Sequence, residues 1–224
     1  MIEQIVGMIG GIGPESTIEY YRAFIAAGHR AIVLNSVNLP QLLAWMGAGE
    51  FEPTADYLAA EVKRLAAAGA TVALMTANSP HIVFDEVQAR SPIPLVSIVE
   101  AARAHVASLG LTTTALLGTK FTMQGGFYQR VFERTGLTVL MPSESEQAYI
   151  HDKYMNELLK NVFAPATERG LLAIADAMME RDRIEALILG GTELPLLLKA
   201  STHRGIPLLD TTKIHVAAVL AQIA

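Results

Sequence analysis

The sequence predicts an α/β protein of two similar lobes, each a mostly parallel four-stranded sheet flanked by helices. Short apolar runs alternate with amphipathic helical patterns along the 224 residues, which is typical of parallel strands covered on both faces. Two of these runs, at residues 74–81 and 187–195, end alike in small polar residues and a proline. Because such a run delivers a polar turn at the carboxyl end of a buried strand, both turns are candidate parts of a functional site.

Segments of the two halves of the chain also match in order. The matched pairs are Gly10 with Gly118, Ala77 with Gly191, and residues 93–96 with 206–209. Their offsets of 108, 114 and 113 positions are nearly constant, which favours an internal duplication over chance similarity between segments rich in Ala and Leu. We therefore expect a first lobe of residues 1–97 and 207–224, with residues 98–206 forming the second lobe.

In the first half, a strand at residues 5–10 breaks at a glycine turn, and Pro14 fits the first turn of the helix that follows. Three glycines before a helix can present backbone N–H groups to an anion, although a tight turn for close packing explains them as well. Residues 40–52 have the weakest periodicity of this half, so we expect a loop that covers a site. The other expected elements are strands at residues 31–37, 71–76 and 93–96, and helices at residues 54–68, from about 81, and at 98–109.

The second half repeats this order of elements. A strand at residues 113–117 leads into a second glycine turn, and Ser143 with Glu146 predicts a capping box at the start of a long helix. The other expected elements are a helix up to about Arg134, strands at residues 137–140, 184–189 and 206–209, a helix at 165–180, and a closing helix that carries His215.

Composition excludes several classes of function. With 51% hydrophobic and 17% charged residues, the chain has enough apolar surface for a packed core. A net charge of −5, a single Trp and the lack of a basic stripe argue against nucleic-acid binding. No apolar run reaches the roughly 18 residues of a membrane span, and the N-terminus lacks the pattern of a signal peptide, so we expect a cytoplasmic protein. The absence of Cys excludes disulfides, thiolate metal ligands and thiol nucleophiles.

Five segments of the chain resemble the aspartate/glutamate racemase family. They are Ile9-Gly10-Gly11-Ile12-Gly13-Pro14-Glu15-Ser16-Thr17, Ala77-Asn78-Ser79-Pro80-His81, Gly118-Thr119, Gly190-Gly191-Thr192-Glu193-Leu194-Pro195 and Pro207-Leu208-Leu209-Asp210. The likeness covers nearly the whole chain, with all of these segments in order. It implies two α/β lobes with the active site in the cleft between them, cofactor-independent racemisation of an acidic amino acid, and a homodimer.

The chain departs from the family at both of its catalytic positions. The resemblance implies one catalytic cysteine on each lobe, and these positions are Ala77 and Gly191 here. A thiol can exchange a proton once its surroundings adjust its pKa, whereas a methyl group or a hydrogen atom cannot. The two-thiol mechanism is therefore excluded. Engineered cysteine removal explains Ala77 better than Gly191, so natural loss is favoured, accompanied either by another proton-transfer reaction or by a cleft that binds without chemistry.

Glu193 and His81 are the first candidates for acid/base chemistry without thiols. A carboxylate or imidazole whose pKa is moved toward neutrality by burial can act as a general base, and both residues follow the polar turns closely. Each can equally well cap or brace the start of a helix. A single base suits isomerisation, decarboxylation or hydrolysis, while racemisation needs two bases or one that reaches both faces of the substrate carbon.

The candidate substrate-binding residues are Gly11, Asn78, Ser79, Thr119 and Thr192. Two expected strands are followed by Asn78 and Ser79 in the first half and by Thr192 in the second. Their side chains can donate hydrogen bonds to a carboxylate, as the resemblance implies. Helix capping is the alternative role for each of these residue types.

Other polar residues are weaker candidates. Asp210 is expected to tie a helix N-terminus, and His215 to pack on its helix. Lys153 or Lys160 lies where the family often carries a cation for the distal carboxylate, but residues 40–50 lack the Arg that members acting on acidic substrates often use. No cluster has metal-ligand spacing, so we predict no metal and no other cofactor. The expected partner is a small carboxylate or amino acid, with no nucleic acid and no membrane.

Overall fold

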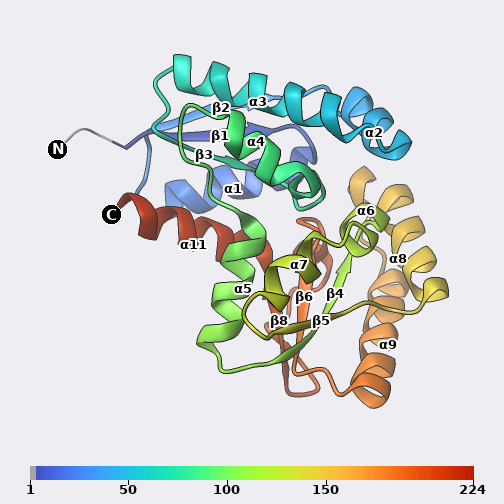
Figure 1. Cartoon of the computed structure of the whole chain (residues 1–224). Helices are drawn as coiled ribbons and strands as arrows, with labels where there is room; N and C mark the ends of the chain where they lie inside the picture. Colours follow the sequence, from blue (N-terminus) through green and yellow to red (C-terminus); the bar gives the residue numbers. More distant parts are fainter. Residues whose placement is uncertain (1–3) are drawn as a thin grey trace. The chain divides into compact units, whose positions relative to one another are not determined.

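The computed structural model describes residues 4–224 and has the predicted α/β architecture (Figure 1). The chain forms two compact units. One unit runs to Ile98 and resumes at His215, and the other is Val99–Ile214. Each unit contains a largely parallel sheet with helices around it.

The first unit contains a three-stranded parallel sheet in the order β2-β1-β3. Its strands are β1 (Val6–Gly10), β2 (Ile32–Ser36) and β3 (Val72–Met75). Its helices are α1 (Pro14–Ala26), α2 (Leu39–Ala48), α3 (Phe51–Ala67), the 3-10 helix η1 (Ser79–Val83) and α4 (Phe84–Arg90). A single parallel bridge between Ala73 and Leu95 adds a fourth position beside β3.

The second unit contains a five-stranded sheet in the order β5-β4-β6-β8-β7, in which only β7 runs antiparallel to its neighbour. Its strands are β4 (Thr113–Gly118), β5 (Thr138–Leu140), β6 (Ala186–Gly190), β7 (Thr202–His203) and β8 (Ile206–Asp210). The helices of this part of the chain are α5 (Ile98–Ser108), α6 (Lys120–Gln124), α7 (Phe127–Glu133), α8 (Glu144–Asn156), η2 (Leu158–Lys160), α9 (Pro165–Asp182), α10 (Leu194–Leu197) and α11 (Thr211–Ile223).

The registers of the two sheets repeat one another. Val6 of β1 lies opposite Val72 of β3, and Thr114 of β4 lies opposite Ala186 of β6. The second pair follows the first by 108 and 114 positions, which are the offsets between the glycine turns and between the polar turns. The same central strand pairing is therefore built twice, as expected for an internal duplication.

A fourth parallel position completes the repeat in each sheet. The bridge from Ala73 to Leu95 corresponds to the pairing of Leu187 in β6 with Leu208 in β8. This position is a full strand in the second unit and a single bridge in the first. The strand expected at residues 93–96 is thus reduced to this bridge. Instead of four strands each, the sheets have three strands plus a bridge, and four parallel strands plus β7.

The structure corrects the expected boundary of the first lobe at residues 207–210. These residues belong to β8, which pairs with β6 and is therefore part of the second sheet. The chain passes from one unit to the other inside α11, between Ile214 and His215. The internal repeat accounts for the position of β8 in the second sheet, because β8 lies beside β6 as Leu95 lies beside β3.

The loop expected at residues 40–52 is wrong, because α2 and the start of α3 occupy this segment. Asn38 caps α2 by accepting a backbone N–H of the first turn at 3.2 Å, and Gly49 ends the helix with a φ of 73°. Leu42 and Met46 are the buried residues of α2, one turn apart. Two inward positions give too weak a periodicity for a helix to be recognised in the sequence.

Other helix boundaries are confirmed. Pro14 lies in the first turn of α1, and Gly69 follows α3 with a φ of 98°. Ser143 and Glu146 form the reciprocal capping box of α8. These local signals hold because the groups that make them are within one turn of the helix end.

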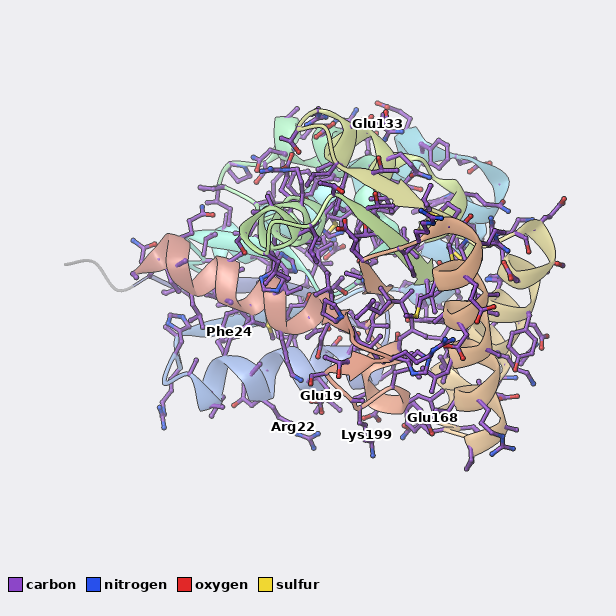
Figure 2. All side chains as sticks on the ribbon, turned by 90° about the horizontal axis from the view of Figure 1, so that it is seen from below. Glu19, Arg22, Phe24, Glu133, Glu168 and Lys199 are labelled. Atoms are coloured by element: carbon purple, nitrogen blue, oxygen red, sulfur yellow. The ribbon has the colours of Figure 1, made fainter. Side chains whose placement is uncertain are left out.

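Each unit has its own apolar core. On α1, Phe24 is buried and packs in a cluster with Val219 of α11, while Glu19 and Arg22 form an exposed ion pair of 2.7 Å on the outer side of the helix (Figure 2). The core of the second unit gathers side chains of β4, β6, α8 and α9. Within the described part of the chain, no helix is long and apolar enough to cross a membrane.

Candidate functional site

The carboxyl ends of β1 and β3 bring the first glycine turn beside the first polar turn. Gly11 donates its backbone N–H to Thr17 Oγ1 at 3.0 Å, and Thr17 Oγ1 lies 3.3 Å from Thr76 Oγ1. Gly11 has a φ of 80°, and a Cβ there would meet Ser36 Oγ at 2.1 Å, so only glycine fits. The backbone N–H of Gly11, a predicted binding residue, is therefore already hydrogen-bonded within the protein, to Thr17.

The first polar turn continues directly from β3. Ala77, where the resemblance implies the first catalytic cysteine, is buried, and so is Asn78. Ser79 begins η1, and Asn78 accepts the backbone N–H of His81 through its carbonyl at 3.0 Å. The predicted binding residues Asn78 and Ser79 therefore lie together at the carboxyl edge of the first sheet.

His81 uses both of its ring nitrogens for backbone hydrogen bonds. Nε2 accepts the N–H of Ile98 at 3.2 Å, so Nδ1 carries the proton and donates it to the carbonyl of Ala77 at 3.0 Å. Burial, and then the neighbouring His215, lower the pKa of His81 to about 3. The neutral ring stacks on Phe84 and ties the start of α5 to the end of β3. This geometry favours a positioning role over acid/base chemistry.

His215 has a similar arrangement in the core of the first unit. Its Nε2 lies 2.9 Å from the carbonyl of Val96 and donates to it, and its Nδ1 accepts the hydroxyl of Tyr20 at 2.8 Å. The ring is fully buried, and burial lowers its pKa to about 4. His215 therefore packs as a neutral imidazole, with Tyr20 as a partner that the sequence did not reveal.

The carboxyl ends of β4 and β8 in the second unit are occupied by helix caps. Thr119 accepts the N–H of Thr122 at 3.3 Å as the cap of α6. Asp210 accepts the N–H groups of Thr212 and Lys213 at 3.0 and 3.2 Å, which is the helix-tying role expected for it. The hydroxyl of Thr119 therefore has a structural partner in addition to any ligand.

The second polar turn, after β6, contains a buried hydrogen-bonded cluster. Tyr154 of α8 donates its hydroxyl to Glu193 Oε2, and Thr192 donates to the same oxygen at 3.1 Å. The N–H of Glu193 points back to Tyr154 Oη at 3.4 Å. All three residues are buried. Burial, followed by the negative charge of Glu193, raises the pKa of Tyr154 well above its ordinary value.

Tyr154 also occupies the space of a side chain at position 191. A Cβ built on Gly191 would lie 2.4 Å from Tyr154 Cε2 and 2.6 Å from Tyr154 Oη. Contacts this short do not occur in folded proteins, so a side chain at 191 and the present position of the Tyr154 ring exclude one another. The space beside Gly191, where the resemblance implies the second catalytic cysteine, is thus filled by a phenol from α8.

Comparison with known proteins identifies the family. A sequence model of the Asp/Glu/Hydantoin racemase family matches residues 9–219. The chain belongs to this family. Among curated proteins it is similar to the broad specificity amino-acid racemase RacX of Bacillus subtilis (strain 168), at 21% identity over 93% of both chains. The predicted resemblance is thereby confirmed, and it supports an enzyme of the isomerase class.

Solved structures of the racemase family share the whole fold. PH1733, an aspartate racemase homologue from Pyrococcus horikoshii OT3, superposes with a TM-score of 0.82 at 29% identity, covering 98% of this chain and 99% of that one. A Yersinia pestis protein provisionally named as an Asp/Glu racemase gives a TM-score of 0.85 at 28% identity, covering 98% and 99%. The two-lobe α/β fold expected from the sequence is thus confirmed.

Against this racemase background, Tyr154 is the residue that sequence reasoning missed. Ile150, Tyr154 and Leu158 are buried at a spacing of four, whereas Lys153 pairs with Glu157 at 2.5 Å on the more exposed side. The apolar stripe of the helix therefore turns Tyr154 inward and Lys153 outward. That apolar stripe is the signal in the sequence that marks Tyr154 as an inward residue.

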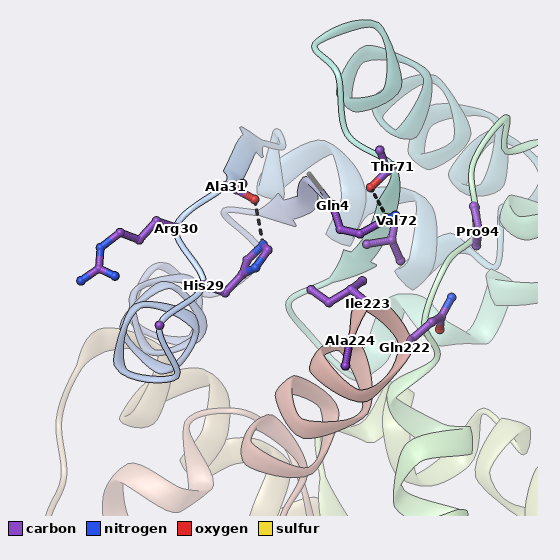
Figure 3. A pocket seen from close by; sticks show the side chains of 11 residues that line it. Gln4, His29, Arg30, Ala31, Thr71, Val72, Pro94, Gln222, Ile223 and Ala224 are labelled. Carbon is purple, nitrogen blue, oxygen red and sulfur yellow. Dashed lines mark hydrogen bonds between the residues drawn. The ribbon is translucent and has the colours of Figure 1, made fainter. Parts of the chain in front are cut away.

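A separate cavity of about 1090 Å³ lies at the opposite edge of the first sheet (Figure 3). Its lining includes Gln4, Ala31 and Thr71, which lie one or two residues before the starts of β1, β2 and β3. Gln222, near the end of α11, also lines it. His29 bonds to the carbonyl of Ala31 at 3.0 Å within this lining. The cavity is at the amino ends of the strands of the first sheet, whereas the first glycine turn and the first polar turn follow the carboxyl ends of these strands.

Proposed function

We propose that this chain catalyses cofactor-independent proton transfer at the carbon beside the carboxylate of a small amino acid or related acid, without thiols. The observation that carries the proposal is the buried Glu193 carboxylate, which follows β6 two residues after the second family cysteine position. Hydrogen bonds from Tyr154 and Thr192 fix this carboxylate in one orientation. A fixed carboxylate in a water-poor site is a suitable general base.

We propose that Asn78 and Ser79 are carboxylate-binding residues of the first unit, and that Thr119 and Thr192 are carboxylate-binding residues of the second unit. Each is a donor near the carboxyl end of a parallel strand, which is where α/β proteins bind ligands. Gly11 and Thr192 are weaker members of this set, because the N–H of Gly11 already donates to Thr17 and the hydroxyl of Thr192 already donates to Glu193.

The proposed reaction is tested by deuterium exchange. The protein is incubated in D₂O with the L and D forms of aspartate, glutamate and several less acidic amino acids, and loss of the Cα–H signal is followed by NMR. We expect exchange with at least one substrate, reduced at least 100-fold in Glu193→Gln, since general bases contribute about 10²–10⁴ in rate. Glu180→Gln, on the exposed face of α9, is the matched control.

The stereochemistry of exchange shows how many bases act. Because His81 is committed to backbone groups, we expect abstraction from one face only. Exchange of one enantiomer with retention fits this single base acting on one face, whereas equal formation of both enantiomers requires a second proton donor or a base that reaches both faces.

A binding protein without chemistry is the second candidate. It is favoured by one observation, that neither family cysteine position carries a group able to exchange a proton. Ligand-induced thermal stabilisation without any Cα exchange is the result that supports it, because a ligand that binds the folded state raises its stability.

We propose that the chain forms a homodimer through α1 and the edge strand β2. Leu34 on β2 and Tyr21 on α1 are about half exposed, at 50% and 49%. Leu34 lies close to α1, because a Cβ on Gly10 would be 2.6 Å from both Leu34 Cδ1 and Thr17 Cγ2. Exposed apolar residues on an edge strand are a common interface. Sedimentation equilibrium tests this proposal, which expects a dimer for the wild type and a weakened dimer for Leu34→Asp.

A cytoplasmic location stays a prediction.

A further inference from the structure

We propose that the Tyr154 phenol takes over, on the second unit, the proton-transfer position of the missing cysteine at 191, with Glu193 as its proton partner. The inference rests on the proposed thiol-free proton transfer and names the group that contacts the substrate carbon.

The first argument is spatial. Tyr154 Oη lies 2.6 Å from the Cβ that a residue at 191 would have. A side chain at 191 begins at that Cβ, so the phenol oxygen is within the region that a thiol attached there would sample. The phenol and the lost thiol thus exclude one another, and the oxygen remains as the ionisable atom of that region.

The second argument is the hydrogen-bond partner. Tyr154 donates its hydroxyl to Glu193 Oε2, so its proton already points at an acceptor. Thr192 donates to the same oxygen and fixes it. A hydroxyl whose proton has an acceptor in place can receive another proton on its oxygen without a charged intermediate on the phenol.

The third argument is rigidity. Ile150 and Leu158 flank Tyr154 at one-turn spacing and are buried with it in the core of the second unit. The ring therefore has little freedom to leave its place beside Gly191. Reacting groups held on packed helices are positioned more precisely than groups on loops.

The chemistry balances as a relay of two protons. The Cα–H bond of the substrate breaks and its proton passes to Tyr154 Oη, while the O–H bond of Tyr154 breaks and that proton passes to Glu193 Oε2. The electron pair stays on the substrate as a carbanion conjugated with its carboxyl group. The products are a neutral phenol and a protonated Glu193, and the reverse steps return a proton to carbon. Because burial and Glu193 raise the pKa of Tyr154, the phenol is protonated at rest, which a relay requires.

The test compares Tyr154→Phe with Tyr149→Phe in the deuterium-exchange assay. Tyr154→Phe keeps the ring and removes only the hydroxyl, and we expect exchange to fall at least 100-fold. Tyr149 lies on the same helix, so Tyr149→Phe controls for loss of a phenol from α8. Circular dichroism and thermal unfolding establish that both variants are folded.

The two proposals fail in different ways. If Glu193→Gln loses exchange and Tyr154→Phe keeps it, the relay is refuted and the proposed function stands. If the wild type exchanges no substrate, both are refuted. A second readout separates proton transfer from positioning: 3-fluorotyrosine at position 154 acidifies the phenol while keeping its hydrogen bond. We expect a changed exchange rate and pH profile, and an unchanged profile contradicts a proton-transferring phenol.

Discussion

Gly191→Ala provides a direct test of the packing between Gly191 and Tyr154. Gly191 has no positive φ, so its backbone accepts alanine, and a Gly→Ala change at a compatible site usually stabilises by about 0.4–1 kcal/mol. Here the added methyl would lie 2.4 Å from Tyr154 Cε2 and 2.8 Å from Cζ. Overpacking of this kind costs about 1–3 kcal/mol, and displacing the hydroxyl from Glu193 adds about 1–3 kcal/mol.

We therefore expect Gly191→Ala to lower the free energy of unfolding by roughly 1–6 kcal/mol, measured by urea denaturation followed by circular dichroism. Gly47→Ala on α2 is the matched control, because nothing lies within 4 Å of its Cβ. It should raise stability by about 0.5–1 kcal/mol through helix propensity.

A double-mutant cycle with Tyr154→Ala assigns the cost to the ring. Tyr154→Ala alone should cost about 3–5 kcal/mol through the cavity it leaves. In that background Gly191→Ala should be neutral or slightly stabilising, so the two changes are strongly non-additive. Additive effects, or a Gly191→Ala variant as stable as Gly47→Ala, refute the packing described between Tyr154 and Gly191.

Three further predictions concern the two buried histidines, the partner of His215, and the cap of α11. His81 and His215 have folded-state pKa values of about 3 and about 4, below the ordinary 6.5, so the unfolded chain binds protons that the folded chain does not. Stability should be full above pH 6.5 and fall as the pH drops toward 4, by up to about 1.4 kcal/mol per pH unit for each histidine, seen as a falling urea midpoint. Tyr20→Phe leaves Nδ1 of His215 without its donor and should cost about 1–3 kcal/mol, with a smaller loss contradicting the assigned tautomer. Asp210→Ala removes the cap of α11 and should cost about 1 kcal/mol in thermal unfolding, whereas Asp210→Asn should keep most of it.

The strands and the duplication could be predicted because their signals are repeated. Buried parallel strands are continuous apolar runs, so β1, β3, β4 and β6 stand out from the helices between them. Because each of these strands has a counterpart in the other half of the chain, each copy supports the prediction of the other. The capping box of Ser143 and Glu146 was equally accessible, because both partners lie within four residues.

The parts that could not be predicted depend on contacts between distant residues. β8 belongs to the second sheet because it pairs with the edge of β6, and no local sequence pattern indicates which sheet a strand joins. The Tyr154–Glu193 contact joins residues 39 positions apart, and the sequence shows only that Gly191 is small. The reason for that small residue lies in the helix that packs over it.

The passage of α11 from one unit into the other has a consequence for the order of synthesis. Residues up to Ile98 leave the ribosome first, yet their unit also requires His215 and the residues that follow it. Until those arrive, Tyr20 and Val96 lack their histidine partner, and the cluster around Phe24 lacks Val216 and Val219. The unit Val99–Ile214 is continuous and can close as soon as it emerges. The part of the protein made first is therefore the part completed last.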